Sequence, residues 1–305
     1  MTSAKPDLSL WLLLIFLGLI WGGSFPASVI ALTGFSPLWV AALRITLAAV
    51  ILLAFTFLSG RRLPETRTAL GRRVWLHALG MAIFTNALPF SLLSWGQLHV
   101  SAGFAGITMA VVPLVVLPLA HFLIPGDFMT KAKLAGFASG FIGVVVLIGP
   151  GAFLNSGADQ ESLARLTCLG AAGCYAIGSI ITRLSPPFSQ VGFGAAALTL
   201  ASLIIVPVAF VAGGAPQMPD LPALAAVIYL GLIPTALATV ILVHIIEQAG
   251  PSFMSLVNYQ VPVWAAVMGV AFLSEALPGR FIGALALILA GLAISQRRQR
   301  AASAR

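Results

Sequence analysis

Four residues near the start of the chain share one helix face and could contact a small molecule. Trp21, Ser24, Phe25 and Ser28 follow the spacing i, i+3, i+4 and i+7, which places side chains on the same side of an α-helix. They lie in the run 10–31, which has no charged residue but holds two adjacent glycines and a proline at its centre. A helix that serves only as an anchor has no need of residues that weaken it. The pattern therefore predicts that this helix lines a path for a solute.

Helix packing is the alternative explanation for the same segment. Gly18 and Gly22 form a small-xxx-small pair, which lets another helix approach closely. Trp21 would then fill a gap between helices.

Polar or aromatic residues also occupy the centres of further apolar runs. Prolines among them free a backbone carbonyl, which a neighbouring group, water or a substrate can satisfy. Each residue taken singly suits helix packing and cavity lining equally well. Taken together with Trp21, Ser24 and Phe25, they predict a substrate cavity lined by Asn86, Pro89, Phe90, Thr108, Met109, Tyr175, Thr235, Thr239, Asn258 and Tyr259.

Arg44 is a permanently charged residue inside an apolar run. It lies seven residues from one end of its predicted helix, which corresponds to a depth of about 10 Å. An ionisable residue within a span is a functional candidate, so Arg44 is a possible contact for a substrate carboxylate. The alternatives are that it binds carbonyls of neighbouring helices or extends toward the interface.

The residues needed for catalysis or metal binding do not cluster in the sequence. The eight carboxylates lie in predicted loops or at helix ends, away from positions where a proton- or sodium-coupling group would lie. They are Asp7, Glu65, Asp127, Asp159, Glu161, Asp220, Glu247 and Glu275. Neither a phosphate-binding loop nor a paired metal-ligand motif is present. We therefore expect no catalytic residue, no metal and no cofactor.

The composition identifies the elements that must position these residues. Of 305 residues, 60% are hydrophobic and 8% are charged, whereas soluble domains carry roughly 25% charged residues. The apolar residues form blocks long enough to cross a bilayer, which takes about 20 residues per helix. We predict an all-α integral membrane protein whose ten transmembrane helices span residues 9–31, 37–58, 74–96, 101–124, 132–150, 165–184, 189–212, 222–247, 252–273 and 279–296.

The charged residues predict the orientation of these helices. With a cytoplasmic N-terminus and ten spans, thirteen basic residues fall inside and only Arg165 and Arg280 fall outside, as the positive-inside rule requires. The net charge of +8 therefore indicates topology and does not indicate nucleic acid. Cys168 and Cys174 lie six residues apart in one apolar run and are expected to be packing residues. We expect no cleavable signal peptide, because the first apolar run is too long for one.

Two halves of the chain show related patterns. Pro113 and Pro262 each lie in the middle of the fourth predicted helix of a half. Five spans per half is an odd number, so the second half must be inverted relative to the first. We predict two inverted five-helix repeats, residues 1–154 and 155–305, with a binding site at the midplane between them and alternating access around it.

The repeat also predicts a counterpart for the first helix. Tyr175 follows Trp21 by 154 residues and occupies the equivalent position of the sixth helix. We expect these two helices to face each other at the midplane, with Trp21 and Tyr175 not turned to the lipid.

The chain resembles the drug/metabolite transporter superfamily, and within it the EamA family, including the YddG-type amino-acid exporters. The resemblance covers nearly the whole chain. It rests on Trp21-Gly22-Gly23-Ser24-Phe25, Leu43-Arg44, Val100-Ser101-Ala102, Pro113, Gly250-Pro251, Pro262 and Ser274-Glu275 with Gly283. The first half departs from the family pattern because Gly126-Asp127 stands where the family usually has Gly-Glu. The resemblance implies export of small metabolites, with amino acids as a well-represented substrate class.

We therefore expect a secondary transporter in the cytoplasmic (inner) membrane of a bacterium, exporting neutral, apolar or aromatic amino acids. The expected partners are a small-molecule substrate and the lipid bilayer, without nucleic acid, and the oligomeric state is left open, with a monomer as one option. An alternative is a permease of the same fold for a drug, a sugar or a nucleotide-type metabolite. A membrane-embedded enzyme acting on lipids is a remote third, because the carboxylates are scattered singly.

Overall fold

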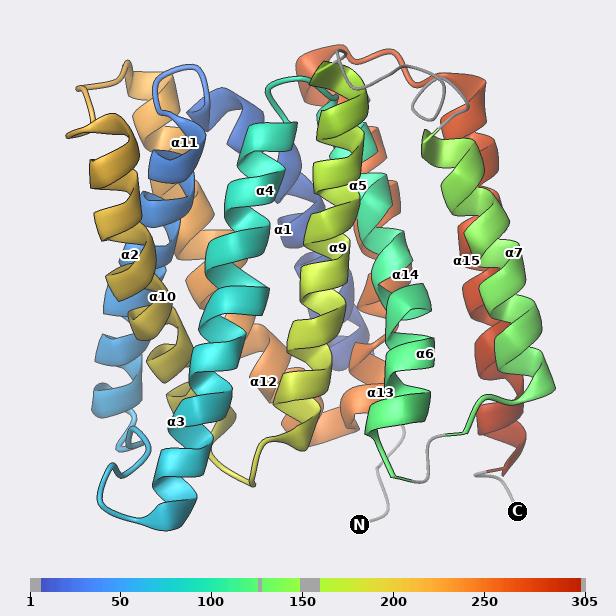
Figure 1. Ribbon diagram of the computed structural model, residues 1–305, viewed down its shortest axis with the longest axis horizontal. Helices are drawn as coiled ribbons and strands as arrows, with labels where there is room; N and C mark the ends of the chain where they lie inside the picture. The colour runs from blue at the N-terminus through green and yellow to red at the C-terminus, as the bar shows by residue number, and fades with distance from the viewer. Residues whose placement is uncertain (1–6, 126–127, 149–159, 303–305) are drawn as a thin grey trace.

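The regular structure consists of helices that run roughly parallel and antiparallel to one another (Figure 1). The computed structural model describes residues 7–125, 128–148 and 160–302. No strand occurs among them. Gly126-Asp127 and the predicted boundary between residues 154 and 155 lie outside the described residues.

The first half begins with two long helices and continues with two interrupted ones. Its elements are α1 (Leu8–Ala31), α2 (Pro37–Leu58), α3 (Ala69–Met81), η1 (Ala82–Ala87), α4 (Leu88–Gly96), α5 (Ala102–Thr108), η2 (Met109–Val111), α6 (Val112–Leu123) and α7 (Lys131–Ile148). The second half contains α9 (Gln160–Leu184), α10 (Gln190–Gly213), α11 (Leu221–Gly231), η3 (Leu232–Leu237), α12 (Ala238–Ala249), α13 (Pro251–Met254), α14 (Val257–Leu273) and α15 (Gly279–Ala302).

The predicted spans match these helices closely. Within the described residues, seven continuous helical runs are long and apolar enough to cross a membrane: 8–31, 37–58, 69–96, 102–123, 160–184, 190–213 and 221–249. Val257–Leu273 and the described part Gly279–Ile294 are apolar but shorter, and α7 has 18 residues.

Two predicted helix starts were wrong, the tenth helix continues to residue 302 and not 296, and one predicted helix is interrupted. The third run begins at residue 69 and not at 74, because the Thr68 hydroxyl caps it by accepting a hydrogen bond from the Gly71 amide. The sixth begins at 160 and not at 165. The ninth is broken between α13 and α14. Hydropathy marks the apolar part of a helix, whereas a polar cap can lie beyond it.

Two of the runs contain a π-helical turn, η1 and η3, which start 150 residues apart at Ala82 and Leu232. In η3, Pro234 has no N–H to donate to the Leu230 carbonyl, and the Thr235 hydroxyl donates to that carbonyl instead, at 2.8 Å. In η1, the Asn86 side-chain amide donates to the Met81 carbonyl at 3.2 Å. π-turns are frequent at functional sites.

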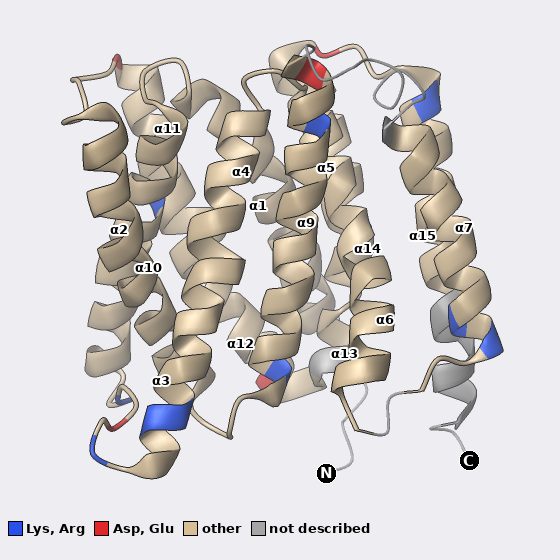
Figure 2. Cartoon of the chain, viewed as in Figure 1, with Lys and Arg blue, Asp and Glu red and all other residues tan. Residues whose placement is uncertain are grey.

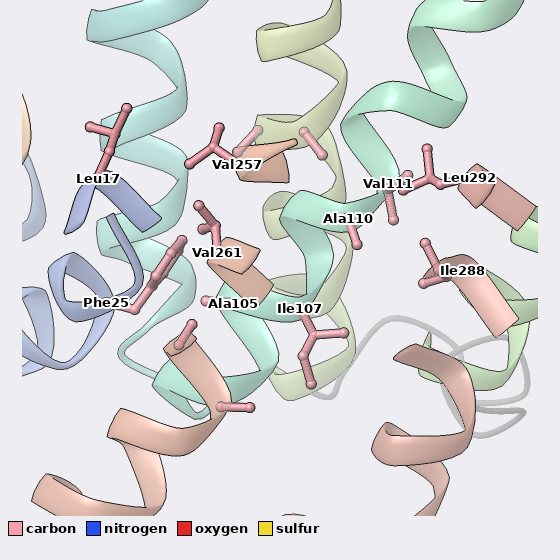
Figure 3. Packing of buried hydrophobic residues seen from close by; sticks show 14 of the residues in the cluster. Leu17, Phe25, Ala105, Ile107, Ala110, Val111, Val257, Val261, Ile288 and Leu292 are labelled. Carbon is pink, nitrogen blue, oxygen red and sulfur yellow. The ribbon is translucent and has the colours of Figure 1, made fainter. Parts of the chain in front are cut away.

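The glycines of α1 serve close packing against α14. A Cβ atom at Gly22 would lie 2.5 Å from Trp264 Cβ, and one at Gly18 would lie 3.0 Å from the Gln260 side chain. The prediction that these glycines admit a neighbouring helix is confirmed. Figure 3 shows the adjoining core, in which Phe25 of α1 points toward Val261 of α14.

The helices α7 and α15 pack mainly on each other and form one edge of the bundle (Figure 1). They hold no residue of the predicted cavity. Charged residues gather at the two ends of the helices, and Lys and Arg are more frequent at the end where α3 begins (Figure 2). The middle of the bundle is therefore almost entirely uncharged, as a protein surrounded by lipid requires.

Candidate functional site

Arg44 is held between two interrupted helices in the interior. Its Nε donates a hydrogen bond of 2.8 Å to the Thr235 hydroxyl in η3. Its guanidinium carbon lies 3.9 Å from the centroid of the Phe90 ring in α4. Only 8% of the residue is exposed. A charged side chain from α2 thus joins α4 to η3.

Two tyrosines complete the surroundings of this arginine. The ring of Tyr175, from α9, packs edge-on against Phe90 with 6.4 Å between centroids. The phenol groups of Tyr175 and Tyr229 lie within electrostatic range of the Arg44 guanidinium. We call Arg44, Phe90, Tyr175, Tyr229 and Thr235 the arginine cluster. Its members come from α2, α4, α9 and the continuous run formed by α11 and η3, and these four segments are well separated in the chain.

The first helix is attached to the same region through Trp21. The Trp21 indole donates a hydrogen bond of 3.2 Å to the Pro234 carbonyl, next to Thr235. A Cβ atom at Gly23 would lie 3.3 Å from the Tyr229 hydroxyl, so α1 also passes close to the cluster there. Trp21 and Tyr175 both pack against the largest buried cluster of apolar residues. Neither side chain is turned wholly to the lipid.

The arginine cluster lies at the level of the middle of the bundle, although α2 places the Arg44 backbone nearer one end. Thr235 is the fifteenth residue of the 29-residue run 221–249. The long side chain of Arg44 carries its charge to that level. The depth of about 10 Å predicted for Arg44 from the sequence refers to its backbone and does not include the length of its side chain.

The other hydroxyls of the predicted cavity are used within their own helices. Ser24 donates to the Trp21 carbonyl at 2.7 Å, Thr108 to the Ala105 carbonyl at 2.6 Å, and Thr239 to the Thr235 carbonyl at 2.7 Å. Hydroxyls in this arrangement satisfy backbone acceptors. These donors are therefore committed to the local backbone.

The remaining predicted residues differ in their surroundings. Asn86 lies in η1 and Pro89 begins the turn that carries Phe90. Phe25 is buried in the apolar cluster, and Met109 packs against it. Asn258 and Tyr259 lie in the first turn of α14, so their predicted position at the centre of a continuous ninth helix was wrong. The break between α13 and α14 moves them to a helix start.

Sequence reasoning missed two residues of this interior. Tyr229 is one of only three tyrosines in the chain, and all three lie in apolar runs, which could have singled it out. Gln97 is buried and donates from Nε2 to the Phe25 carbonyl at 2.9 Å. Its position at the end of an apolar run gave no such signal.

Glu275, predicted to be a loop carboxylate, makes a specific link between the two halves. Its two oxygens accept hydrogen bonds from the Ala102 and Gly103 amides, at 2.6 and 2.9 Å. A Cβ atom at Gly269 would lie 2.5 Å from Glu275 Oε2, so the glycine leaves room for the carboxylate. A carboxylate at a helix N-terminus is favoured by the unpaired amides and the helix dipole.

The described residues hold no group of three or more His, Cys, Asp or Glu side chains that could bind a metal ion. Cys168 and Cys174 are free and buried, which agrees with the predicted packing role. Around Arg44, the described residues bring together one cation, three aromatic rings and a threonine hydroxyl.

Known proteins match this chain over nearly its full length. A protein named as a probable terminal-alkyne amino-acid exporter, from Streptantibioticus cattleyicolor, is 27% identical over 297 residues, covering 96% of this chain and 95% of that protein. An inner membrane transporter of Escherichia coli K12 named YedA is 27% identical over 269 residues, covering 87% and 83%. PecM of Dickeya dadantii is also 27% identical, covering 91% and 89%.

A solved crystal structure shares the fold, with a TM-score of 0.66, 21% identity and coverage of 96% of this chain and 99% of that one. The model of the EamA-like transporter family matches residues 9–149 and again residues 162–296. Together these stretches include every helix that contributes to the arginine cluster. The chain is a multi-span membrane transporter that belongs to the EamA-like transporter family.

Proposed function

We propose that this chain is a secondary transporter that exports neutral amino acids with apolar or aromatic side chains. The observation that carries the proposal is the arginine cluster, in which one cation lies among aromatic rings at the middle of the bundle. Such a lining suits a zwitterion with an apolar side chain. A relative named as a probable amino-acid exporter supports the same cargo.

Transport proceeds by alternating access between two inverted five-helix repeats. The two separate matches to one family model support a duplication. The π-turns η1 and η3 start 150 residues apart in helices that the repeat pairs with each other. The helix contacts follow the same pairing: α1 packs on α14 and α11, and α9 packs on α6 and α4. Folds of this kind bind substrate near the midplane, where the repeats meet.

The transporter resides in the inner membrane of a bacterium, with both termini in the cytoplasm. The excess of Lys and Arg on one side supports this orientation. Relatives named as inner membrane transporters support the location. The partly exposed residues of the predicted cavity, such as Trp21, Phe90 and Tyr175, serve as its walls, and the arginine cluster is its polar centre.

Counterflow into proteoliposomes tests the cargo directly. Purified protein is reconstituted with unlabelled amino acid inside, and entry of labelled phenylalanine or leucine is followed. Empty liposomes and competition by a sugar, a nucleoside and a hydrophobic cation serve as controls. We expect uptake that unlabelled aromatic and aliphatic amino acids compete away. Competition only by the sugar, the nucleoside or the cation would assign the same fold to another cargo.

A further inference from the structure

We infer that Arg44 binds the carboxylate of the transported molecule, and that a carboxylate beside an apolar or aromatic group is therefore the chemical signature of the substrate. This inference deepens the proposed function and rests on it for the nature of the cargo. It also makes a claim of its own, because any aromatic carboxylate should bind at Arg44 whether or not amino acids are transported.

The charge of Arg44 has no partner of opposite sign within the part of the chain that the structure describes. A buried cation without a counterion is costly, because the interior does not replace the solvation that water provides. The cation–π contact with Phe90 offsets part of this cost. A bound anion would remove the remainder.

The guanidinium is fixed in a way that leaves its binding edge available. Nε is engaged by Thr235 and one face lies over Phe90. The two terminal nitrogens make no hydrogen bond to the described residues, and neither is among the fully buried unpaired atoms found there. They therefore retain accessible surface. Two parallel N–H groups on a planar fork match the two oxygens of a carboxylate.

The surroundings determine what else the ligand carries. Phe90 and Tyr175 offer aromatic surface next to the cation, which suits an apolar or aromatic side chain. Tyr229 adds a hydroxyl that can accept from an ammonium group. A ligand with only positive charge meets repulsion from Arg44. Amines that lack a carboxylate should therefore bind poorly.

A matched set of three ligands separates these contributions: L-phenylalanine, 3-phenylpropionate, which lacks the ammonium, and phenethylamine, which lacks the carboxylate. Binding is measured by thermal stabilisation of the purified protein and by competition for counterflow. In the wild type we expect both carboxylates to bind, and phenethylamine to bind at least about 10-fold more weakly than phenylalanine.

Substitution of Arg44 tests the anchor itself. Arg44→Gln should weaken the binding of both carboxylates by roughly 10- to 100-fold, as expected for loss of a charge-assisted pair. The binding of phenethylamine should be unchanged or tighter. The control is Arg280→Gln, which removes the same charge from an exposed position at the start of α15. It should bind all three ligands as the wild type does.

A second variant keeps the test valid if Arg44→Gln does not fold. Thr235→Val removes the acceptor that orients Nε but keeps the charge. Because Thr235 is a positioning residue, Thr235→Val should weaken the binding of carboxylates by a few-fold and leave the binding of phenethylamine unchanged. Thr235→Ser should restore the wild-type binding pattern.

The outcomes separate this inference from the proposed function. If phenylalanine is transported but phenethylamine binds equally well and Arg44→Gln has no effect, the anchor is refuted and amino-acid export stands. If no amino acid is transported but 3-phenylpropionate stabilises the wild type and not Arg44→Gln, the anchor stands and the cargo is refuted. If neither carboxylate stabilises the wild type, the inference is refuted.

Discussion

The contact between α1 and α14 allows a prediction in which two glycine substitutions have opposite effects on stability. A Cβ atom at Gly22 would lie 2.5 Å from Trp264 Cβ and 2.9 Å from the Ala265 amide nitrogen. Ordinary contacts begin near 3.4 Å. The nearest atoms belong to the backbone or are bonded to it, and they cannot move aside as a flexible side chain could. Gly22→Ala must therefore move the two helices apart by about 1 Å. Overpacking of this kind costs roughly 1–3 kcal/mol.

Gly173 in α9 is the matched control. A Cβ atom there meets nothing within 4 Å, so Gly173→Ala should introduce no clash. Replacing glycine by alanine in a helix interior favours the helix by about 0.5–1 kcal/mol. We therefore expect Gly22→Ala to lower the unfolding temperature by several degrees and Gly173→Ala to leave it unchanged or raise it.

The chain supplies its own reporter for this measurement. Cys168 and Cys174 are both buried, so a thiol-reactive fluorescent dye should label them only as the protein unfolds. Heating detergent-solubilised variants with the dye gives the unfolding temperature without added probes. Equal unfolding temperatures for the two variants would refute the assignment of Gly22 to a tight helix contact.

Three further predictions concern single contacts. Trp21→Phe keeps the aromatic ring but removes the indole donor, and should slow counterflow while changing the unfolding temperature little; an unchanged rate would return the residue to a packing role. Glu275→Ala leaves the first two amides of α5 without their carboxylate and should lower the free energy of unfolding by about 2–3 kcal/mol. Glu275→Gln should lower it by about half as much, and both variants are measured with the same dye. The Asp7 carboxylate caps α1, and its hydrogen bond from the Leu10 amide holds its pKa below the ordinary value of 3.8. The cap therefore stabilises α1 above that value, and this stabilisation is lost as pH falls through the lowered pKa. Near neutral pH, Asp7→Ala should speed hydrogen exchange in the first turn of α1. Wild-type exchange rates in this variant would contradict the cap.

The residues of the arginine cluster were less accessible to sequence reasoning than the helices. Arg44, Phe90, Tyr175 and Thr235 were predicted because polar or aromatic residues in apolar runs are unusual. Tyr229 shares the same environment and was not selected. Ser24 and Thr108 were selected on chemical type, yet their hydroxyls bind carbonyls of their own helices. Residue type predicts what a side chain can do but does not specify the atom that it contacts.

The position of each helix follows from the sequence by itself. In lipid, every backbone N–H and C=O must be paired within the segment, so an apolar run of about 20 residues has a single solution, the helix. The placement of Lys and Arg in the connections similarly predicts the orientation. The first of these rules accounts for the agreement between the predicted spans and the observed ones.

Only the tertiary structure decides which faces of these helices meet. Several helices, among them α1, α2, α10 and α14, are apolar on all sides, so no amphipathic pattern distinguishes their inner face from a lipid-facing one. The contact of Arg44 with Thr235 joins residues 191 positions apart, and the link from Glu275 to Ala102 joins residues 173 apart. The first contact depends on the π-turn that holds Thr235, and the second depends on Gly269, which leaves room for the carboxylate. Both form only when the helices are assembled.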